Sequence, residues 1–522
     1  MSPGLSHADH RHSPPTIDVP RNYNAAWDLI ARNIETERAG KTAYIDDRGS
    51  YTFADLDERS AHVAAWLRAT GIRPEQRILV CMLDSFELPS LFLGAIRAGV
   101  IPVLVNTLLV AEDYRYMLRD SRAQIAVVSE PLMGNFQGCV EEIAPLQRIL
   151  SSTPGGEYEQ CIDEVHPDPS VEPTIADDAC FWLYSSGSTG APKGTVHLHS
   201  SLIATAELYA KPVLGIEEGD TVFSAAKLFF AYGLGNALTF PLSVGATTVL
   251  MAERPTPQAV FRRLVEHQPT IFYGVPTLYA ALLADPNLPA QNDVALRRCT
   301  SAGEALPKDL GERWSAHFGV DILDGIGSTE MLHIFLSNAP EDLEYGTTGK
   351  PVPGYTARLV GDDGQDVAPG EIGELHVAGP TSAAMYWNNR AKSRQTFLGD
   401  WTRTGDKYLR NESGYYVYCG RSDDMLKVGG IYVSPTEVES ALIGHEAVLE
   451  AAVVGKADEE NLIKPAAFVV LTGDNTPGEE LMVALQAHVK HQLAPYKYPR
   501  WIEFVSELPK TATGKIQRFK LR

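Results

Sequence analysis

Cysteine, basic charge and long apolar runs are all scarce in this chain. The six cysteines are scattered, without a C-x-x-C pair or the spacing of a metal site, which argues against a disulfide scaffold and favours reduced thiols. The formal net charge of −21 argues against nucleic acid or an anionic membrane as a partner. No run approaches the ~18 apolar residues of a membrane span, and residues 1–22 lack the apolar core of a signal peptide. We therefore expect a soluble, cytoplasmic protein.

The length and composition favour a globular protein of more than one domain. Apolar residues make up 44% of the chain and charged residues 21%, which is typical of folded globular proteins. A chain of 522 residues exceeds the usual size of a single hydrophobic core. We expect a disordered segment over residues 1–20, a large domain over residues 21–422 and a small domain over residues 423–522.

Alternating helical and apolar segments predict an α/β fold with parallel sheets for the large domain. From Leu56, "LDERSAHVAAWLRATG" repeats apolar residues at helical spacing, and the run "RILVCML" that follows is typical of a buried strand. "ELPSLFLGAIRAG" and "VIPVLV" repeat this pair, and "AQIAVVS", "TTVLM", "TIFYGV" and "VDILDGIG" predict further strands. Around Gly354, apolar and polar residues alternate between Gly and Asp, which indicates a small β module of antiparallel hairpins.

Two marked helix starts predict a compact α+β fold for the small domain. In "SPTEV", Ser434 can cap a helix, Pro435 suits its first position and Glu437 can close a capping box. "TPGEE" repeats this arrangement from Thr476. The helix that follows would place four apolar residues on one face: Leu481, Leu485, Val489 and Leu493.

The sequence "YSSGSTGAPKG" at residues 184–194 has the composition of a phosphate-binding loop. Glycines let the backbone approach a phosphate, the hydroxyls of Ser and Thr can donate to it, and Lys193 adds positive charge. The Walker A pattern is absent, because Gly187 and Gly190 are only three residues apart and Pro192 precedes the lysine. By itself, this composition is equally typical of a flexible surface loop.

Four further motifs give the loop a context. They are "GIGSTE" at residues 325–330, "TGD" at 404–406, "GRSDDMLKVGGIYVSPTEVE" at 420–439 and "PKTATGKIQR" at 509–518. In this order, after the loop, the motifs resemble those of the adenylate-forming superfamily, which includes acyl-CoA synthetases, adenylation domains of peptide synthetases and firefly luciferase. The resemblance covers nearly the whole chain beyond the first 20 or so residues. It implies a large domain that holds ATP and the acid, followed by a small mobile domain.

The family reaction has two steps. A carboxylate attacks the α-phosphate of ATP and expels pyrophosphate, and a thiol then attacks the resulting acyl-adenylate and releases AMP. Catalysis of the first step needs positioned donors, a cation and Mg²⁺ around the phosphates. The resemblance therefore implies that ATP, Mg²⁺ and coenzyme A bind to this chain.

The resemblance also assigns the nucleotide site residue by residue. Ser185, Ser186, Gly187, Ser188 and Thr189 would hold the β- and γ-phosphates, with Lys193 as a supporting charge. Thr329 would contact the α-phosphate, Glu330 would bind Mg²⁺, and Asp406, reinforced by Arg421, would hold the ribose hydroxyls. The residues that would frame adenine and complete the nucleotide site are Ala302, Gly303, Glu304, Asp324, Gly325, Ile326, Gly327 and Ser328. Ile326 stands where the family often has an aromatic residue, which puts the strength of base stacking in question.

Lys515 would be the catalytic lysine, because an ammonium on a flexible stem can reach both the carboxylate and the α-phosphate. Its site cannot also admit a long thiol arm, so the family rotates the small domain between the two steps. Asp423 matches the hinge of this rotation. Gly429 and Gly430 would then line the pantetheine tunnel, where side chains would block the thiol.

The acyl pocket resembles that of the benzoate-CoA ligase branch, with its hydroxybenzoate and aminobenzoate relatives. The candidate pocket residues are Ala231, Tyr232, Gly327, His333 and Ile334. A slot walled by aromatic and branched residues suits a flat aromatic acid, although Phe229 and Phe230 nearby are equally typical of a core. His333 could bond a ring hydroxyl, form a wall or orient the carboxylate.

The favoured function is an AMP-forming aryl-CoA ligase that acts on benzoate. The alternatives are a 4-hydroxybenzoate- or 2-aminobenzoate-CoA ligase, and an enzyme that loads an aryl acid onto a carrier protein. A luciferase-like oxygenase has no support in the sequence, and a non-catalytic nucleotide sensor could have lost Glu330 or Lys515, which are both present. The expected partners are an aromatic carboxylate, ATP and CoA, with a homodimer as a candidate assembly.

Overall fold

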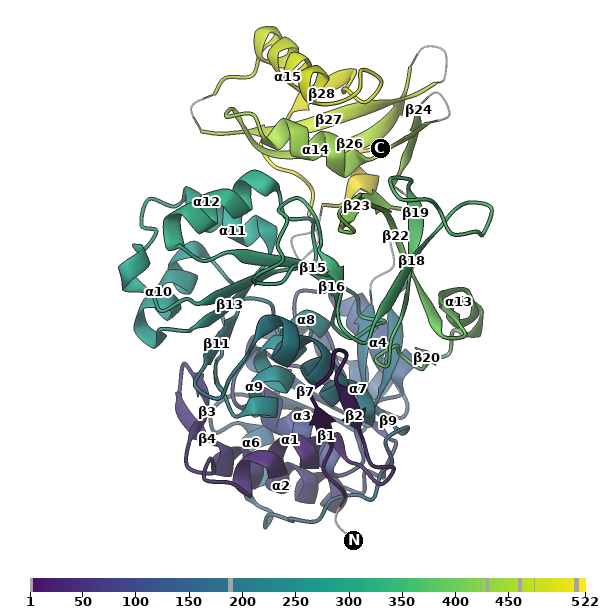
Figure 1. The fold of residues 1–522 in the computed structure, drawn as a ribbon. Helices are drawn as coiled ribbons and strands as arrows, with labels where there is room; N and C mark the ends of the chain where they lie inside the picture. Colours follow the sequence, from purple (N-terminus) through teal and green to yellow (C-terminus); the bar gives the residue numbers. More distant parts are fainter. Residues whose placement is uncertain are drawn as a thin grey trace.

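The computed structural model describes most of the chain, namely residues 3–185, 191–422, 424–428, 431–458, 462–473, 475–510 and 516–522. In Figure 1 the elements of the first half lie at the bottom, the C-terminal elements (yellow) lie at the top, and a green β module connects them on one side. Within the described residues, no helix has both the length and the apolar character needed to cross a membrane.

The first sheet has seven strands in the order β20-β10-β9-β6-β5-β7-β8. Strands β5 to β9 are parallel to one another, and β10 and β20 extend the edge at β9 in antiparallel pairs. The strands are β5 (Arg77–Cys81), β6 (Ile101–Leu104), β7 (Ile125–Ser129), β8 (Arg148–Ser152), β9 (Ala179–Ser185), β10 (Lys193–Leu198) and β20 (Met385–Tyr386). Helices α1 (Ala25–Ile34), α2 (Phe53–Ala69) and α3 (Glu87–Arg97) pack on one another beside this sheet.

The second sheet has nine strands in the order β17-β16-β15-β14-β13-β11-β12-β3-β4. Its six central strands are parallel, and β4, β16 and β17 are antiparallel to their neighbours. The strands are β3 (Thr42–Asp46), β4 (Gly49–Thr52), β11 (Thr221–Ser224), β12 (Thr247–Val249), β13 (Ile271–Gly274), β14 (Arg298–Ser301), β15 (Ile322–Gly327), β16 (Ile334–Ser337) and β17 (Lys350–Pro351).

Further helices lie around these two sheets, with α13 at the edge strand β20 and the β module (Figure 1). They are α4 (Ala111–Ser121), α5 (Cys139–Glu142), α6 (Glu157–Asp163), α7 (His199–Thr205), α8 (Ala231–Leu234), α9 (Phe240–Val244), α10 (Pro257–His267), α11 (Pro276–Ala284), α12 (Lys308–Phe318) and α13 (Arg390–Thr396).

An antiparallel β module follows the second sheet, as the alternation around Gly354 predicts. It consists of β18 (Thr356–Val360), β19 (Gly373–Ala378), β21 (Phe397–Leu398), β22 (Trp401–Arg410) and β23 (Tyr416–Arg421). The small C-terminal unit then combines the hairpin of β24 (Leu426–Val428) and β25 (Ile431–Val433) with helices α14 (Pro435–Ile443) and α15 (Glu479–Gln492) and a sheet of β26 (Val448–Ala457), β27 (Ile463–Leu471) and β28 (Trp501–Phe504). The predicted fold class is therefore confirmed.

Local sequence explains where several elements begin and what they bury. Ile78, Leu79 and Val80 of β5 are fully buried, as expected for a parallel strand covered on both faces. Helix α2 begins with a capping box, in which Thr52 Oγ accepts from the Asp55 amide and the Asp55 carboxylate accepts from the Thr52 amide. In α15, Leu485 and Val489 are buried and Leu481 and Leu493 pack against the same core, which confirms the predicted apolar face.

The helix caps of the C-terminal unit confirm one prediction and correct another. Ser434 caps α14 by accepting from the Glu437 amide at 3.1 Å, but the Glu437 carboxylate binds Lys497 instead of closing a capping box. The predicted cap at Thr476 is wrong. Helix α15 begins at Glu479 after an extended Gly478, and no side chain caps it.

The predicted disorder over residues 1–20 is wrong for the described residues 3–20. Strands β1 (His7–Asp9) and β2 (Thr16–Asp18) form an antiparallel hairpin. Two polar contacts fix this hairpin to the body: His10 Nε2 lies 2.6 Å from Glu207 Oε2, and Ser6 Oγ donates to Asp28 Oδ2. Composition alone does not reveal these distant partners.

Candidate active site

Strand β15 carries the central motif of the site. Gly325 and Gly327 face the neighbouring strand β16 so closely that a side chain would not fit. A Cβ on Gly325 would lie 2.8 Å from the Leu336 carbonyl oxygen, and one on Gly327 would lie 2.7 Å from the His333 carbonyl group. The pairing shifts register between Ile326 and Gly327. Glycine is therefore required where the motif leaves the sheet.

The residues predicted to frame adenine lie at the carboxyl ends of adjacent parallel strands. Ala302, Gly303 and Glu304 follow β14 directly, and Gly303 has a φ of +92°, which glycine adopts without strain. Asp324 is buried in β15, and burial raises the pKa of its carboxyl well above the ordinary range. Its Oδ1 has no hydrogen-bond donor among the described residues. Ser328 Oγ accepts from the Met331 amide at 3.2 Å and so caps the turn after β15.

Glu330 lies beside an aromatic hydroxyl that the motif analysis did not predict. Tyr386 OH donates to Glu330 Oε1 at 2.7 Å, and the Tyr386 ring lies 4.9 Å from Lys193 Nζ. Burial, followed by the Glu330 carboxylate, raises the pKa of Tyr386. Burial lowers the pKa of Lys193, and Glu330 opposes that change. The three side chains thus form a compact group of one anion, one cation and one aromatic ring.

The phosphate-loop motif joins two antiparallel strands. Ser185 ends β9 and Lys193 begins β10, and the two residues are cross-strand partners. Ser185 Oγ is buried and has no partner among the described residues. Ser186, Gly187, Ser188 and Thr189 lie outside the described residues. The ends of the hairpin therefore bring Lys193 to Tyr386, because β20 pairs with β10 through Thr195 and Tyr386.

His197 links this hairpin to the "GSTE" motif. Its Nε2 lies 2.8 Å from the Thr329 carbonyl oxygen, and its ring stacks on Phe181 of β9 with centroids 5.2 Å apart. Burial lowers the pKa of His197 to about 4, so the imidazole is neutral at pH 7. Since a carbonyl only accepts, we assign the proton to Nε2. His197 therefore fixes the backbone at Thr329.

Asp406 and Arg421 lie opposite each other on β22 and β23. Arg421 Nη1 donates to Asp406 Oδ1 at 3.1 Å and to the Thr404 carbonyl oxygen at 3.0 Å. Gly405 has a φ of +74°, and a Cβ there would lie 2.8 Å from Arg421 Nη2. The predicted ribose-binding pair is thus a connected unit in the β module.

Tyr232 and Gly327, two of the candidate acyl-pocket residues, lie beside the buried His333. Its Nε2 lies 3.2 Å from the Tyr232 carbonyl oxygen and 3.1 Å from Asn236 Oδ1, and its ring centroid is 5.6 Å from that of Tyr232. Burial lowers the pKa of His333 to about 3. We assign the single ring proton to Nε2, which faces two acceptors. Nδ1 is then a buried acceptor without a donor among the described residues.

Other members of this predicted pocket have different environments. Ala231 and Tyr232 begin α8 and are half-buried, and Tyr232 OH bonds to Thr300 Oγ1. Ile334 is buried at the start of β16, and its side chain covers Gly325. Phe229 is buried in the main core, with the half-buried Phe230 packed against it.

The described residues do not include every predicted site residue. Lys515, Asp423, Gly429 and Gly430 lie outside them. Conversely, sequence reasoning missed Tyr386 and His197. His197 had no distinct signal, because β10, which follows the phosphate loop directly, also contains the polar residues Lys193 and Thr195. Tyr386 had none either, because its segment reaches Glu330 through contacts that are distant in sequence: β20 pairs with β10, and the Ala383 amide donates to the Glu330 carbonyl oxygen at 2.8 Å.

Family models and known proteins match the chain over most of its length. Residues 30–387 match the family described as AMP-binding enzyme, and residues 437–515 match the AMP-binding enzyme C-terminal domain. The chain is 63% identical to the benzoate–CoA ligase of Thauera aromatica, over 99% of both chains. It is 50% identical to the 4-hydroxybenzoate–CoA/benzoate–CoA ligase of Rhodopseudomonas palustris, over 96% of this chain and 94% of the relative.

Solved structures have the same fold. The benzoate CoA ligase from Burkholderia xenovorans LB400 superposes with a TM-score of 0.91 at 60% identity, over 96% of this chain and 100% of that one. An anthranilate CoA ligase, AuaEII, in complex with anthranoyl-AMP gives a TM-score of 0.93 at 44% identity, over 97% and 98%. By these matches of sequence and fold, the chain belongs to the AMP-binding enzyme family.

Proposed function

We propose that the protein is an AMP-forming benzoate–CoA ligase. Benzoate attacks the α-phosphate of ATP to give benzoyl-adenylate and pyrophosphate, and the CoA thiol then attacks the acyl carbonyl to give benzoyl-CoA and AMP. The observation that carries this proposal is the 63% identity to a benzoate–CoA ligase over nearly the whole of both chains. The ring-walled cluster around His333 supports an aromatic acid as the substrate.

The nucleotide is held by residues from both sheets and the β module. Thr329 contacts the α-phosphate, while Ser185, residues 186–189 and Lys193 hold the β- and γ-phosphates. Asp406 and Arg421 bind the ribose. Residues 302–304 and 324–328 frame the adenine and complete the site. The close approach of β16 to Gly325 and Gly327 supports this arrangement, because it fixes the backbone that presents Thr329.

The donor chemistry at Glu330 fits a magnesium ion. Its carboxylate is a hard oxygen ligand, and Tyr386 holds one of its two oxygens, so the other would hold the ion. When bound, Mg²⁺ neutralises negative charge on the phosphates. Glu330 would hold the ion, Tyr386 orients Glu330, and Lys193 would add a second positive charge.

The acid lies against Ala231, Tyr232, Gly327, His333 and Ile334. The neutral His333 and its aromatic neighbours suit an uncharged aromatic ring such as that of benzoate, since they add no charge to the pocket. One observation favours the alternative of a hydroxybenzoate or aminobenzoate. The buried Nδ1 of His333 is an acceptor that a ring hydroxyl or amino group could use.

The small domain completes each step in turn. Lys515 donates to the carboxylate and the α-phosphate during adenylate formation. Rotation about Asp423 then removes Lys515 and brings Gly429 and Gly430 to the pantetheine arm.

The domain limits are 1–20, 21–422 and 423–522, with residues 3–20 ordered as described above. The enzyme acts in the cytoplasm on small molecules, without nucleic acid or membrane, and a homodimer is the candidate assembly, which sedimentation would test.

A panel of carboxylic acids tests the proposed substrate and acceptor. AMP release is measured with benzoate, hydroxybenzoates, 2-aminobenzoate and medium-chain fatty acids, each with and without CoA. We expect benzoate to give the highest kcat/KM and sustained turnover to require CoA. A preference for fatty acids would contradict the pocket, and turnover that needs a carrier protein would contradict the CoA step.

A further inference from the structure

The turn between β11 and α8 delivers Tyr232 to the candidate acyl pocket. The Phe230 amide donates to the Lys227 carbonyl oxygen at 3.0 Å, which closes the turn. A Cβ on Gly233 would lie 2.1 Å from that same oxygen, so helix α8 is packed directly on the turn. A shift of Leu228 and its neighbours in the turn would therefore also shift Tyr232.

Asp84 holds this turn from the other sheet. It lies in the loop after β5, only 3% of its surface is exposed, and its two carboxylate oxygens lie 3.3 and 3.4 Å from the Leu228 amide nitrogen. The buried Leu228 amide thus has its acceptors on a segment 144 residues away in sequence. Lys227 fixes the adjacent residue, because its ammonium donates to the Met251 and Glu253 carbonyl oxygens.

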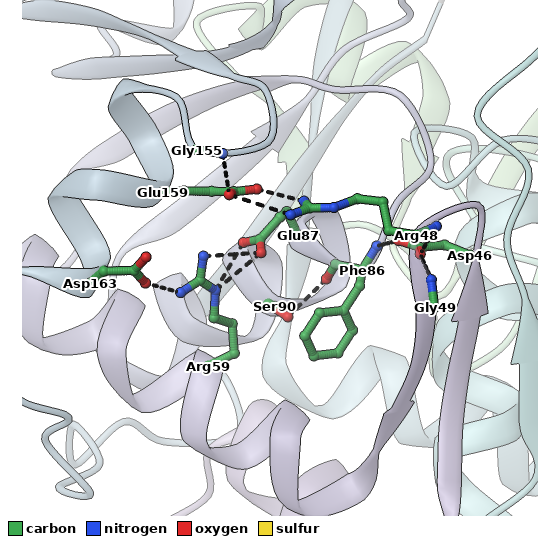
Figure 2. Close-up of polar contacts among 10 residues, drawn as sticks. All are labelled: Asp46, Arg48, Gly49, Arg59, Phe86, Glu87, Ser90, Gly155, Glu159 and Asp163. Carbon is green, nitrogen blue, oxygen red and sulfur yellow. Dashed lines mark hydrogen bonds and ion pairs between the residues drawn. The ribbon is translucent and has the colours of Figure 1, made fainter.

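The loop that carries Asp84 is itself braced on both sides. The Leu83 amide donates to Ser129 Oγ at 3.0 Å, and the Phe86 amide donates to Asp46 Oδ2 at 2.9 Å. Arg59 donates to both oxygens of Glu87 at 3.1 Å. Figure 2 shows the Asp46 and Glu87 contacts, with Arg59 also reaching Asp163 and Arg48 reaching Glu159. A loop held this firmly can act as a fixed support.

Tyr232 connects the Asp84–Leu228 contact to the candidate acyl pocket. The Tyr232 carbonyl oxygen accepts from His333 Nε2, and the two rings are neighbours. If the turn moved, His333 would lose an acceptor and the gap between the two rings would change. Both rings are proposed walls for the aromatic acid.

We propose that Asp84 is a positioning residue for the aromatic acid, which acts by fixing the Leu228 amide and, through this turn, the Tyr232–His333 wall. The inference rests on the proposed function, because it assumes that this wall contacts the acid. It adds a residue from the first sheet to a pocket built from the second.

Three substitutions at Asp84 test the inference. Asp84→Ala removes the acceptor, Asp84→Glu keeps the charge but is one methylene longer, and Asp84→Asn keeps an acceptor in nearly the same place. We expect Asp84→Ala and Asp84→Glu to raise KM for benzoate by about tenfold, the loss expected when a buried amide loses its acceptor. KM for ATP and CoA should change less than twofold. Asp84→Asn should restore most of the benzoate affinity.

Asp220→Asn is the matched control. Asp220 is 4% exposed and lies just before β11, at the end opposite the turn, where it pairs with Arg297. This variant should lower stability and leave the ratio of the KM values for benzoate and ATP unchanged.

Two results would overturn the inference. If the Asp84 variants raise KM for ATP as much as KM for benzoate, or behave like Asp220→Asn, Asp84 has only a structural role. If Asp84→Ala is insoluble, Asp84→Glu decides the question. A wild-type enzyme that makes no benzoyl-CoA would overturn both the proposed function and this inference, whereas a wild-type enzyme that makes it with unaffected Asp84 variants would overturn the inference alone.

Discussion

Replacing Tyr386 by Phe should weaken adenylate formation by removing one hydroxyl. Tyr386 is 3% exposed, and its OH donates to Glu330 Oε1 at 2.7 Å. A hydrogen bond to a charged group contributes about 1.5–3 kcal/mol, which corresponds to about 10- to 150-fold in rate. The phenyl ring keeps its place beneath Lys193, so the cation–π contact remains. We expect kcat/KM for ATP to fall by that factor and the Mg²⁺ concentration for half-maximal activity to rise.

The assay separates the two half-reactions of the Tyr386→Phe enzyme. Pyrophosphate exchange reports adenylate formation, and conversion of supplied benzoyl-adenylate by CoA reports the thiol step. Tyr114→Phe is the control, since Tyr114 is equally buried and its OH donates to the Asn106 carbonyl oxygen, far from Glu330 in sequence. Unchanged exchange in Tyr386→Phe, or an equal loss in the thiol step, would refute the role of Tyr386 in orienting Glu330.

Three further changes have defined outcomes. His197→Phe keeps an aromatic ring against Phe181 but leaves the Thr329 carbonyl oxygen without its donor. Pyrophosphate exchange should therefore fall by about tenfold. A wild-type exchange rate would contradict the role of His197 in fixing the backbone at Thr329. Burial raises the pKa of Asp84 to about 6 from 3.8, because it disfavours the charged carboxylate. The protonated Asp84 therefore stabilises the folded state fully below pH 4, and the free energy of unfolding falls by about 3 kcal/mol as the pH rises past 6. The free energies of urea unfolding of wild type and Asp84→Asn should therefore diverge between pH 4 and 7. Parallel pH profiles would exclude the raised pKa of Asp84. Lys515→Ala should slow adenylate formation by about 100-fold or more and spare the thiol step from benzoyl-adenylate, while equal losses in both steps would exclude its assigned role.

The strands of the core could be predicted because their sequences are almost entirely apolar. "RILVCML" contains β5, whose residues 78–81 are all buried, and a continuous apolar run is typical of a strand covered on both faces. The steric need for Gly325 and Gly327 in "GIGSTE" was not predicted, because it comes from the close approach of residues 333–336. Local sequence was sufficient to predict an element where the element's own residues determine its structure, as in β5.

Contacts between distant segments could not be predicted in the same way. Tyr386 reaches Glu330 because β20 pairs with β10, almost 200 residues earlier in the chain, and because the Ala383 amide donates to the Glu330 carbonyl oxygen. The N-terminal hairpin is ordered by Glu207 and Asp28, which its own polar composition does not indicate. Asp84 likewise bonds to an amide of the other sheet. In each case the partner is defined by tertiary structure, not by spacing along the chain.

Transfer of an isotope from benzoate tests the central claim most directly. Benzoate labelled with oxygen-18 in both carboxylate oxygens is incubated with the enzyme, ATP, Mg²⁺ and CoA, and the products are analysed by mass spectrometry. Attack of the carboxylate on the α-phosphate predicts one labelled oxygen in AMP, one in benzoyl-CoA and none in pyrophosphate. Label in pyrophosphate or phosphate, or AMP without label, would contradict an adenylate intermediate and with it the assigned function.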